Sequence, residues 1–246
     1  MNNEPGPVEA VDTRSLAERV YDQLRQSLLQ GKLRAGQSMT IRSMAKALGT
    51  SEMPVRESMK RLLAERMIVQ RANRTYQVPA LERSEFVELT SIRVSLEGSA
   101  ARQAVENADD ALIGKMTRHN LEMKSNLAEG NSAGVLAANQ EFHFALYRAS
   151  GSEILLQLIE LLWMRSGPYL AEALAEIRDA EDFFSRATET HDRLINALIA
   201  RDEDGVFNAL KDDLESSAHR YEKHIASKLE DSEQEKIVPM PKASKK

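Results

Sequence analysis

Five polar side chains in the second part of the chain could bind a metal ion or an anion. They are Arg93, Asn139, His143, His191 and Asp213. Each lies three or four residues from apolar side chains, which is the spacing of a single helix face. Burying each of them without a partner would cost several kcal/mol. We therefore expect these groups to converge and to satisfy one another.

Two imidazoles and a carboxylate suit zinc, nickel or a similar divalent ion. We predict a metal site formed by His143, His191 and Asp213, with the amide oxygen of Asn139 as a weaker fourth ligand. Arg93 would bind the carboxylate of a small acid held at the open position of the metal. A histidine on an apolar face is more often a hydrogen-bonded core residue, and this alternative stays open.

The elements that must position these residues are helices. Amphipathic patterns predict them at 84–106, 109–129, 132–149, 152–175, 180–200 and 203–228. Together they indicate an all-helical bundle of about six helices over residues 84–229. Residues 230–246 are polar and contain two prolines, which predicts a flexible tail.

The first part of the chain follows a different pattern. After a leader predicted to be flexible, residues 1–13, the order is helix, helix, tight turn and helix, with the turn at 49–51 and Ser51 as the N-cap of the third helix. Alternating residues at 67–80 predict a small β-hairpin whose turn Asn73 can form. This order predicts a winged helix-turn-helix over residues 14–80, so the whole fold is expected to be mainly α.

A helix-turn-helix places the first residues of its second helix in the major groove of DNA. Arg56 is the expected base reader, because a guanidinium can bond O6 and N7 of guanine together. The same stretch also offers Ser51, Glu52 and Met53. Arg42, at the start of the preceding helix, would face the phosphates or the groove edge. Arg71 and Arg74 of the hairpin would touch the DNA backbone or the minor groove.

The distribution of charge supports two modules. The net charge is −5, but residues 1–80 carry 13 Lys and Arg against 8 Asp and Glu, whereas the other 166 residues carry 20 against 30. A basic block joined to an acidic block favours separate functions. The chain has no cysteine, which excludes a thiolate metal site and suits a reducing cytoplasm. Neither a secretory signal nor a membrane-spanning stretch is apparent.

The sequence "LGTSEMPVRE" at 48–57 resembles the DNA-binding core of the GntR family of bacterial transcription regulators. Carried over by position, the resemblance implies DNA contacts by Arg42, Ser51, Glu52, Met53 and Arg56, and it places Asn73 near the glycine of the wing. Glu52 departs from the arginine that is common at its position.

The second part resembles the FCD-type ligand-binding domain of the FadR subfamily. The matching motifs are "RVSLE" at 93–97, "NQEFH" at 139–143, "SGS" at 150–152 and "HDRLINAL" at 191–198. Many members bind a metal with one Asp and three His; the corresponding positions here are Asn139, His143, His191 and Asp213. The resemblance implies a cytoplasmic homodimer that represses transcription from a palindromic operator and responds to a small carboxylic acid.

Two alternatives remain open from the sequence. Two histidines and a carboxylate around an open metal position are also a catalytic arrangement, so His143, His191 and Asp213 could serve a metal-dependent enzyme. The basic winged helix argues against an enzyme. The other alternative is a regulator that binds its ligand without metal or responds to the metal itself.

Overall fold

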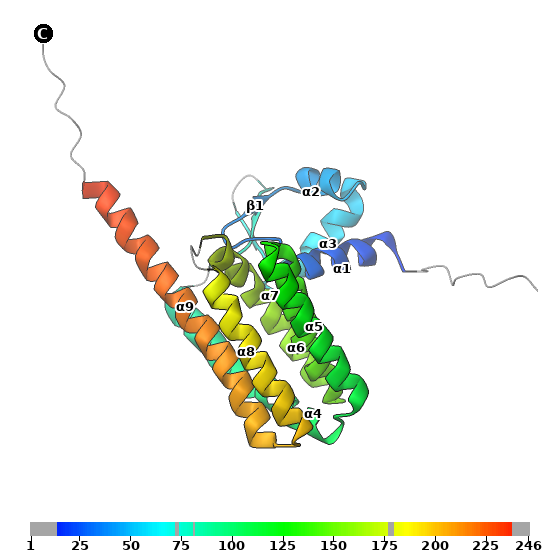
Figure 1. Cartoon of the computed structure of the whole chain (residues 1–246). Coiled ribbons are helices and arrows are strands. Elements are labelled where there is room, and N and C mark those ends of the chain that lie inside the picture. The colour runs from blue at the N-terminus through cyan, green and yellow to red at the C-terminus, as the bar shows by residue number, and fades with distance from the viewer. Residues whose placement is uncertain (1–13, 72–73, 81, 177–179, 238–246) are drawn as a thin grey trace, which may run out of the picture. The chain divides into compact units, whose positions relative to one another are not determined.

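The computed structural model describes residues 14–71, 74–80, 82–176 and 180–237 (Figure 1). The chain divides into two compact units. The N-terminal unit holds Ser38–Gln77 together with the chain up to Gln26, and the bundle unit holds Ser27–Gln37 together with the chain from Val78 on. Within the described ranges, no helix is both long and apolar enough to cross a membrane.

The N-terminal unit has the predicted order of helices and strands. Its elements are α1 (Leu16–Leu29), whose last three residues belong to the bundle unit, β1 (Ser38–Met39), α2 (Ile41–Ala47), α3 (Glu52–Ala64), β2 (Val69–Gln70) and β3 (Tyr76–Gln77). The strands form an antiparallel sheet in the order β1-β3-β2. The predicted winged helix-turn-helix is confirmed, and the wing gains a third strand, β1, that the sequence analysis did not predict.

Local interactions set the angle between α2 and α3. Thr40 begins α2 with a capping box, in which its side chain accepts from the backbone of Ser43 and the side chain of Ser43 accepts in return. Gly49 in the turn has φ 63°, a left-handed conformation that glycine adopts without steric cost. Ser51 occupies the N-cap position of α3, but its side chain makes no capping hydrogen bond. The Ser58 hydroxyl donates to the carbonyl of Ala17 and so ties α3 to α1.

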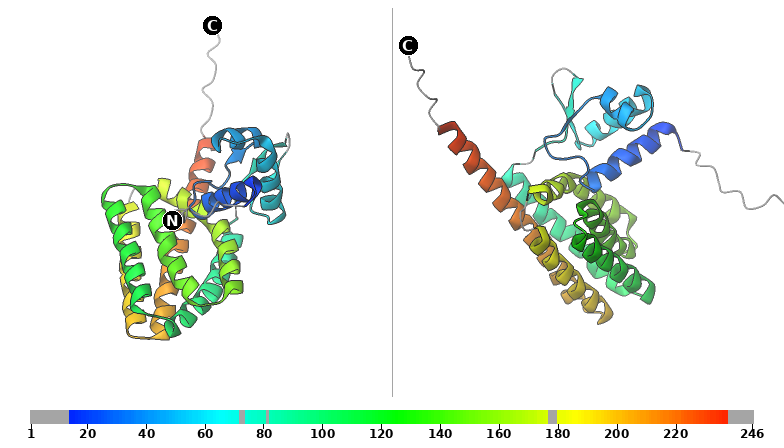
Figure 2. Two further views of the ribbon diagram at one scale, coloured as in Figure 1. Left: turned by 90° about the vertical axis from the view of Figure 1, so that its right-hand side faces the viewer. Right: turned by 45° about the horizontal axis from the view of Figure 1, so that its top comes forward.

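The described part of the bundle unit contains six long helices, as predicted. They are α4 (Arg83–Glu106), α5 (Asp110–Ala128), α6 (Ser132–Ala149), α7 (Glu153–Glu176), α8 (Ala180–Ile199) and α9 (Glu203–Ile237). α5 packs against α6 and α8, and α4 packs against α9, so that the helices lie side by side (Figure 2). α9 continues to Ile237, beyond the predicted end at 228.

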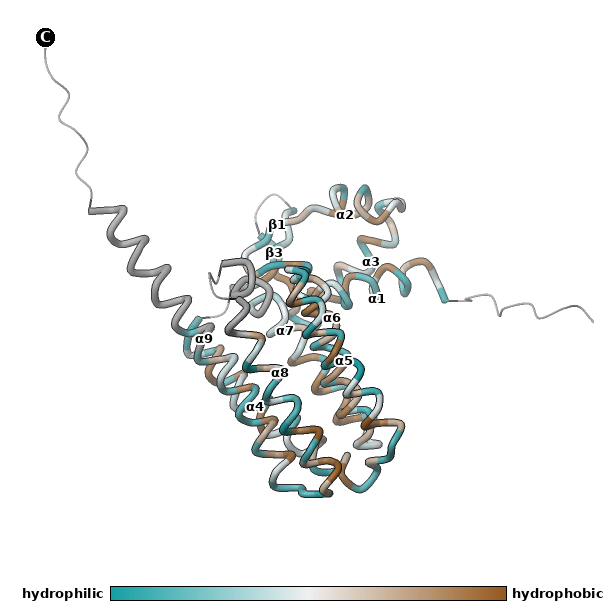
Figure 3. The backbone as a smooth tube through the Cα atoms, viewed as in Figure 1, coloured by the Kyte–Doolittle hydropathy of each residue, from teal (hydrophilic) through white to brown (hydrophobic). Residues whose placement is uncertain are grey.

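The core of the bundle unit is centred on α6, which is buried around most of its circumference. Along the helices, hydrophobic and hydrophilic residues alternate (Figure 3). Phe142, Phe144 and Tyr147 of α6 are fully buried, and Trp163 of α7 packs edge-on against Phe144. Burying a side chain of this size contributes roughly 1.5–3 kcal/mol, so this aromatic group holds polar neighbours in fixed positions.

One turn of α7 lies against two other segments of the bundle unit. A Cβ atom at Gly167 would lie 2.3 Å from the carbonyl oxygen of Leu28, so only glycine allows this approach. The hydroxyl of Tyr169 donates to the carbonyl of Pro79 at 2.6 Å. Residues 166–169 therefore fix the segments that precede β1 and follow β3.

Candidate functional site

Three of the predicted DNA-contacting arginines line one hollow on the N-terminal unit. They are Arg42 from α2, Arg56 from α3 and Arg74, two residues before β3. Glu52 and Gln70 border the same hollow, and all five residues are exposed. A concave surface with three guanidinium groups can bind phosphate oxygens and base edges.

The recognition helix carries an ion pair at its surface. Glu52 Oε2 lies 3.6 Å from Arg56 Nη2, and the two side chains are 52% and 46% exposed. At this exposure the pair contributes at most about 1 kcal/mol to stability, so Arg56 can exchange Glu52 for another partner at low cost. Met53, 67% exposed, offers an apolar contact on the same helix end. Ser51 is exposed beside it.

The wing is described only in part. Asn73, predicted for its turn, lies outside the described residues, and the next residue, Arg74, has a φ of 58°. Arg71 is exposed directly after β2, where its Nε donates to the side chain of Gln77 at 2.8 Å.

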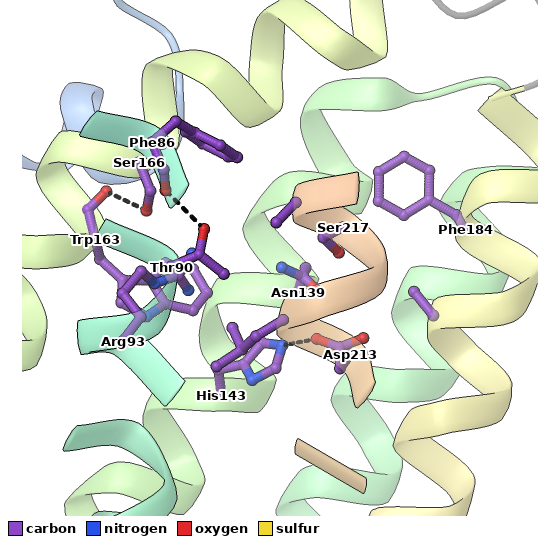
Figure 4. Close-up of a pocket in the computed structure, with 14 residues that line it drawn as sticks. Phe86, Thr90, Arg93, Asn139, His143, Trp163, Ser166, Phe184, Asp213 and Ser217 are labelled. Atoms are coloured by element: carbon purple, nitrogen blue, oxygen red, sulfur yellow. Dashed lines mark hydrogen bonds and ion pairs between the residues drawn. The ribbon is translucent and has the colours of Figure 1, made fainter. Parts of the chain in front are cut away.

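In the bundle unit, three predicted metal ligands meet. His143 of α6, His191 of α8 and Asp213 of α9 are all buried, and their ligand atoms lie within 4.8 Å of one another. His143 Nε2 is 3.2 Å from Asp213 Oδ2, and His191 Nε2 is 3.9 Å from Asp213 Oδ1. Figure 4 shows His143 and Asp213 joined across the cavity, with Asn139 beside them.

The chemistry of these atoms fits a divalent cation. His191 Nε2 is buried and has no hydrogen-bond partner among the described residues. Burial lowers the pKa of His191 to about 3, so this imidazole is neutral at pH 7. Burial would raise the pKa of Asp213, but the hydrogen bond and charge of His143 lower it below its ordinary value, so the carboxylate stays ionised. A buried anion that faces an unpaired imidazole nitrogen forms an incomplete group unless a cation joins them.

Arg93 borders the same cavity, but its guanidinium already has a partner. Its Nε donates to Glu97 Oε1 at 2.6 Å, and its Nη2 lies 3.4 Å from Oε2. Burial alone would lower the pKa of Arg93, but the charge of Glu97 and their hydrogen bond raise it. The guanidinium therefore stays charged, and an acid in the cavity would share it with Glu97.

The cavity leaves space of about 50 Å³ for the centres of water molecules, enough for a few waters or a small ligand. Its walls combine aromatic and hydroxyl groups with the predicted site residues. They are Phe86, Thr90, Arg93, Asn139, His143, Trp163, Ser166, Gly167, Phe184, Ala187, Asp213, Leu214, Ser217 and Ala218.

Comparison with known proteins matches a protein family to each of the two units. The profile of the FCD domain matches residues 88–216, which is more than half of the chain, and that of the bacterial regulatory proteins of the gntR family matches residues 16–78. The chain belongs to the GntR family. It is a DNA-binding transcription regulator of the FadR-like subfamily, as the sequence predicted, and its relatives are regulators rather than enzymes.

Individual relatives extend over most of this GntR-family chain. The HTH-type transcriptional regulator McbR of Escherichia coli K12 is 30% identical over 201 residues, covering 80% of this chain and 88% of the relative. The probable D-xylose utilization operon transcriptional repressor of Paenarthrobacter nicotinovorans is 30% identical over 197 residues, covering 80% and 84%. The solved structure of E. coli McbR/YncC superposes with a TM-score of 0.80 at 28% identity, covering 86% of this chain and all of that one.

Several polar residues of this GntR-family bundle were missed in the sequence. The hydroxyl of Tyr147 donates to Glu97 and lies 3.2 Å from His143 Nδ1. Asn120 Oδ1 lies 3.1 Å from His191 Nδ1. The available signal was helical phase, because Asn120 falls between two buried methionines of α5 and Tyr147 follows His143 by one turn.

Proposed function

We propose that this regulator is a homodimeric repressor whose operator binding is controlled by a small carboxylic acid held beside a divalent metal ion. The observation that carries the proposal is the buried group of His143, His191 and Asp213 at a cavity in the same chain as a DNA-binding unit. Ligand binding at one site and DNA binding at another are coupled by typically 1–3 kcal/mol in allosteric proteins.

The metal would be held by His143, His191 and Asp213, with Asn139 at the cavity wall as the fourth ligand. Zinc or nickel suits two imidazoles and a carboxylate. When bound, the ion supplies a Lewis-acid position for a carboxylate oxygen. Arg93 adds a fixed positive charge, and the limited cavity space favours a small acid.

On DNA, Arg56 would read a guanine in the major groove, and Arg42 and Arg74 would contact phosphates. Met53 would meet a thymine methyl group, and Ser51 a phosphate. Arg71 and Asn73 would contact the DNA backbone or the minor groove. Repression, rather than activation, is supported by the repressor named among the relatives.

A second copy of the chain is the expected partner of an apolar stripe on α7. Ile154, Leu158 and Leu161 are spaced by four and three residues and are 75%, 44% and 36% exposed. Exposed apolar stripes of this kind mark association surfaces, and a two-fold dimer matches a palindromic operator. Leu158→Glu should shift the protein toward monomers in analytical ultracentrifugation; an unchanged dimer would assign the interface to another surface.

Metal analysis tests the central proposal. Protein purified without chelators should contain about one zinc or nickel per chain, and His191→Ala should lose it. His219→Ala is the matched control, because His219 is an exposed histidine on α9. Absence of a bound divalent ion above trace in the wild type would refute the metal and favour a ligand bound without it.

A thermal-shift screen tests the acid. Small carboxylates should raise the melting temperature of the metal-loaded wild type, and the shift should disappear in His191→Ala. The same carboxylates should release operator DNA from the wild type. Equal stabilisation with and without metal would show that the ion takes no part in effector binding.

A further inference from the structure

In both imidazoles of the candidate metal site, the Nδ1 atom has a hydrogen-bond partner. His191 Nδ1 lies 3.1 Å from Asn120 Oδ1, and His143 Nδ1 lies 3.2 Å from the hydroxyl of Tyr147. Asn120 is 2% exposed and Tyr147 is fully buried. The inference below rests on the proposed metal site and concerns what orients its ligands.

The orientation of Asn120 follows from its other neighbours. Its Nδ2 lies 3.1 Å from the carbonyl oxygen of Thr188 and 2.7 Å from Asp192 Oδ1. A carbonyl and a carboxylate can only accept, so the amide NH₂ group must face them. The amide oxygen is then left for His191, whose Nδ1 must carry the hydrogen. Asp192 is itself anchored by Lys124 at 2.7 Å.

The same assignment of donors and acceptors applies to His143. Tyr147 has one hydroxyl hydrogen, and Glu97 lies against that hydroxyl. Glu97 accepts from Arg93 through its other oxygen at 2.6 Å, and the hydroxyl donates to Glu97 Oε2. The tyrosine oxygen can then only accept from His143, whose Nδ1 must carry the hydrogen.

We propose that Asn120 and Tyr147 are positioning residues: each accepts from the Nδ1–H of one histidine, and together they direct the Nε2 atoms of His191 and His143 at Asp213. Phe142 supports this arrangement by stacking on the His191 ring, with centroids 3.7 Å apart and planes 10° apart, and by meeting the His143 ring edge-on. The ligand atoms are therefore oriented before a metal arrives. Such outer partners typically contribute about 10–100-fold to metal affinity.

Tyr147→Phe and Asn120→Ala test this proposal in the full chain. Zinc affinity, measured by competition with a chromophoric chelator, should fall by about 10–100-fold in each variant. Tyr169→Phe is the matched control: it removes a hydroxyl that donates to Pro79 in the same unit, and its zinc affinity should equal that of the wild type. Thermal unfolding of each variant separates a loss of positioning from a loss of fold.

A second readout does not depend on metal. In metal-free protein with ¹⁵N-labelled histidine, two-bond ¹H–¹⁵N spectra should show His191 with a protonated Nδ1 and an unprotonated Nε2. Asn120→Ala should convert His191 to a tautomer mixture. If the wild type binds no zinc or nickel, the proposed metal site fails, while the expected tautomer still supports the positioning role. A protonated Nε2 on neutral His191, or wild-type zinc affinity in both variants, would overturn the inference.

Discussion

Two arginine–glutamate pairs with the same helical spacing behave differently in the two units. On α3, Glu52 and Arg56 are 3.6 Å apart and about half exposed. On α4, Arg93 and Glu97 are 2.6 Å apart, and their side chains are 16% and 0% exposed. The pair on α3 has the orientation favoured in isolated helices, with the acid first. The closer contact nevertheless occurs on α4, so burial and not spacing determines the geometry.

The difference matches the work of each unit. A surface that must bind DNA needs charged groups that can leave their partners, and water keeps the cost of that exchange low. A buried ligand site needs groups that stay in place, and a dry environment makes separation costly. The same residue types therefore give an adaptable surface on α3 and a fixed scaffold on α4.

The largest difference in the free energy of unfolding is expected when the glutamate of each pair is replaced. Glu97→Leu should lower the free energy of unfolding by about 3–5 kcal/mol, because the buried Arg93 charge loses its partner. Glu52→Leu should change it by at most about 1 kcal/mol. Urea denaturation of both variants gives the comparison, and similar losses would show that burial does not separate the two pairs.

Lowering the pH should reduce the stability of the bundle unit through the buried His191. The pKa of His191 is about 3 in the folded protein, against 6.5 for an exposed histidine, so the unfolded chain binds a proton here that the folded protein does not. The stability of the metal-free protein should be fully present above pH 6.5 and should fall by about 3 kcal/mol by pH 4, at about 1.4 kcal/mol per pKa unit. The lowered pKa of Asp213 acts in the same direction at lower pH. Denaturation across this range should show a smaller slope in His191→Gln.

Arg56→Ala tests the exposed region. Loss of a bidentate guanine contact should cost about 1–3 kcal/mol per half-site, which reduces specific operator binding toward the non-specific level. The fold and the oligomeric state should not change. Arg118→Ala removes an equivalent exposed charge from α5 and should bind operator as the wild type does. Unchanged footprinting by Arg56→Ala would remove this residue as a base reader.

The smallest effect is expected from Glu52→Arg. Replacing the glutamate with an arginine near the phosphates should tighten operator binding several-fold and reduce its sequence selectivity. The slope of log affinity against log salt concentration should become steeper by about one for each added phosphate contact. Glu57→Arg makes the same charge change on another face of α3. If both variants tighten binding equally, net charge and not position explains the effect.

The sequence revealed the helices of the bundle because each amphipathic stripe is a local pattern. It also indicated that His143, His191 and Asp213 face inward, since they share those stripes. It did not reveal which atoms meet. Asn120 and His191 are 71 residues apart, and their contact depends on how α5 packs against α8.

The sequence also left two other features unresolved. Glu97 was part of the motif at 93–97. The spacing of that motif did not show whether the Arg93 side chain contacts Glu97 or a ligand, because that depends on burial. β1 has only two residues, too few for an alternating pattern.

The turn of α7 at residues 166–169 has a further consequence. Ser166 and Gly167 form part of the cavity wall, while Gly167 and Tyr169 contact the segments that lead into and out of the N-terminal unit. If the proposed acid shifts this turn, it must also shift the anchors of those segments, because the carbonyl oxygen of Leu28 cannot rotate away as a side chain would. Linkage would then apply in reverse: operator DNA would change the affinity for the proposed acid by the same factor as the acid changes the affinity for DNA.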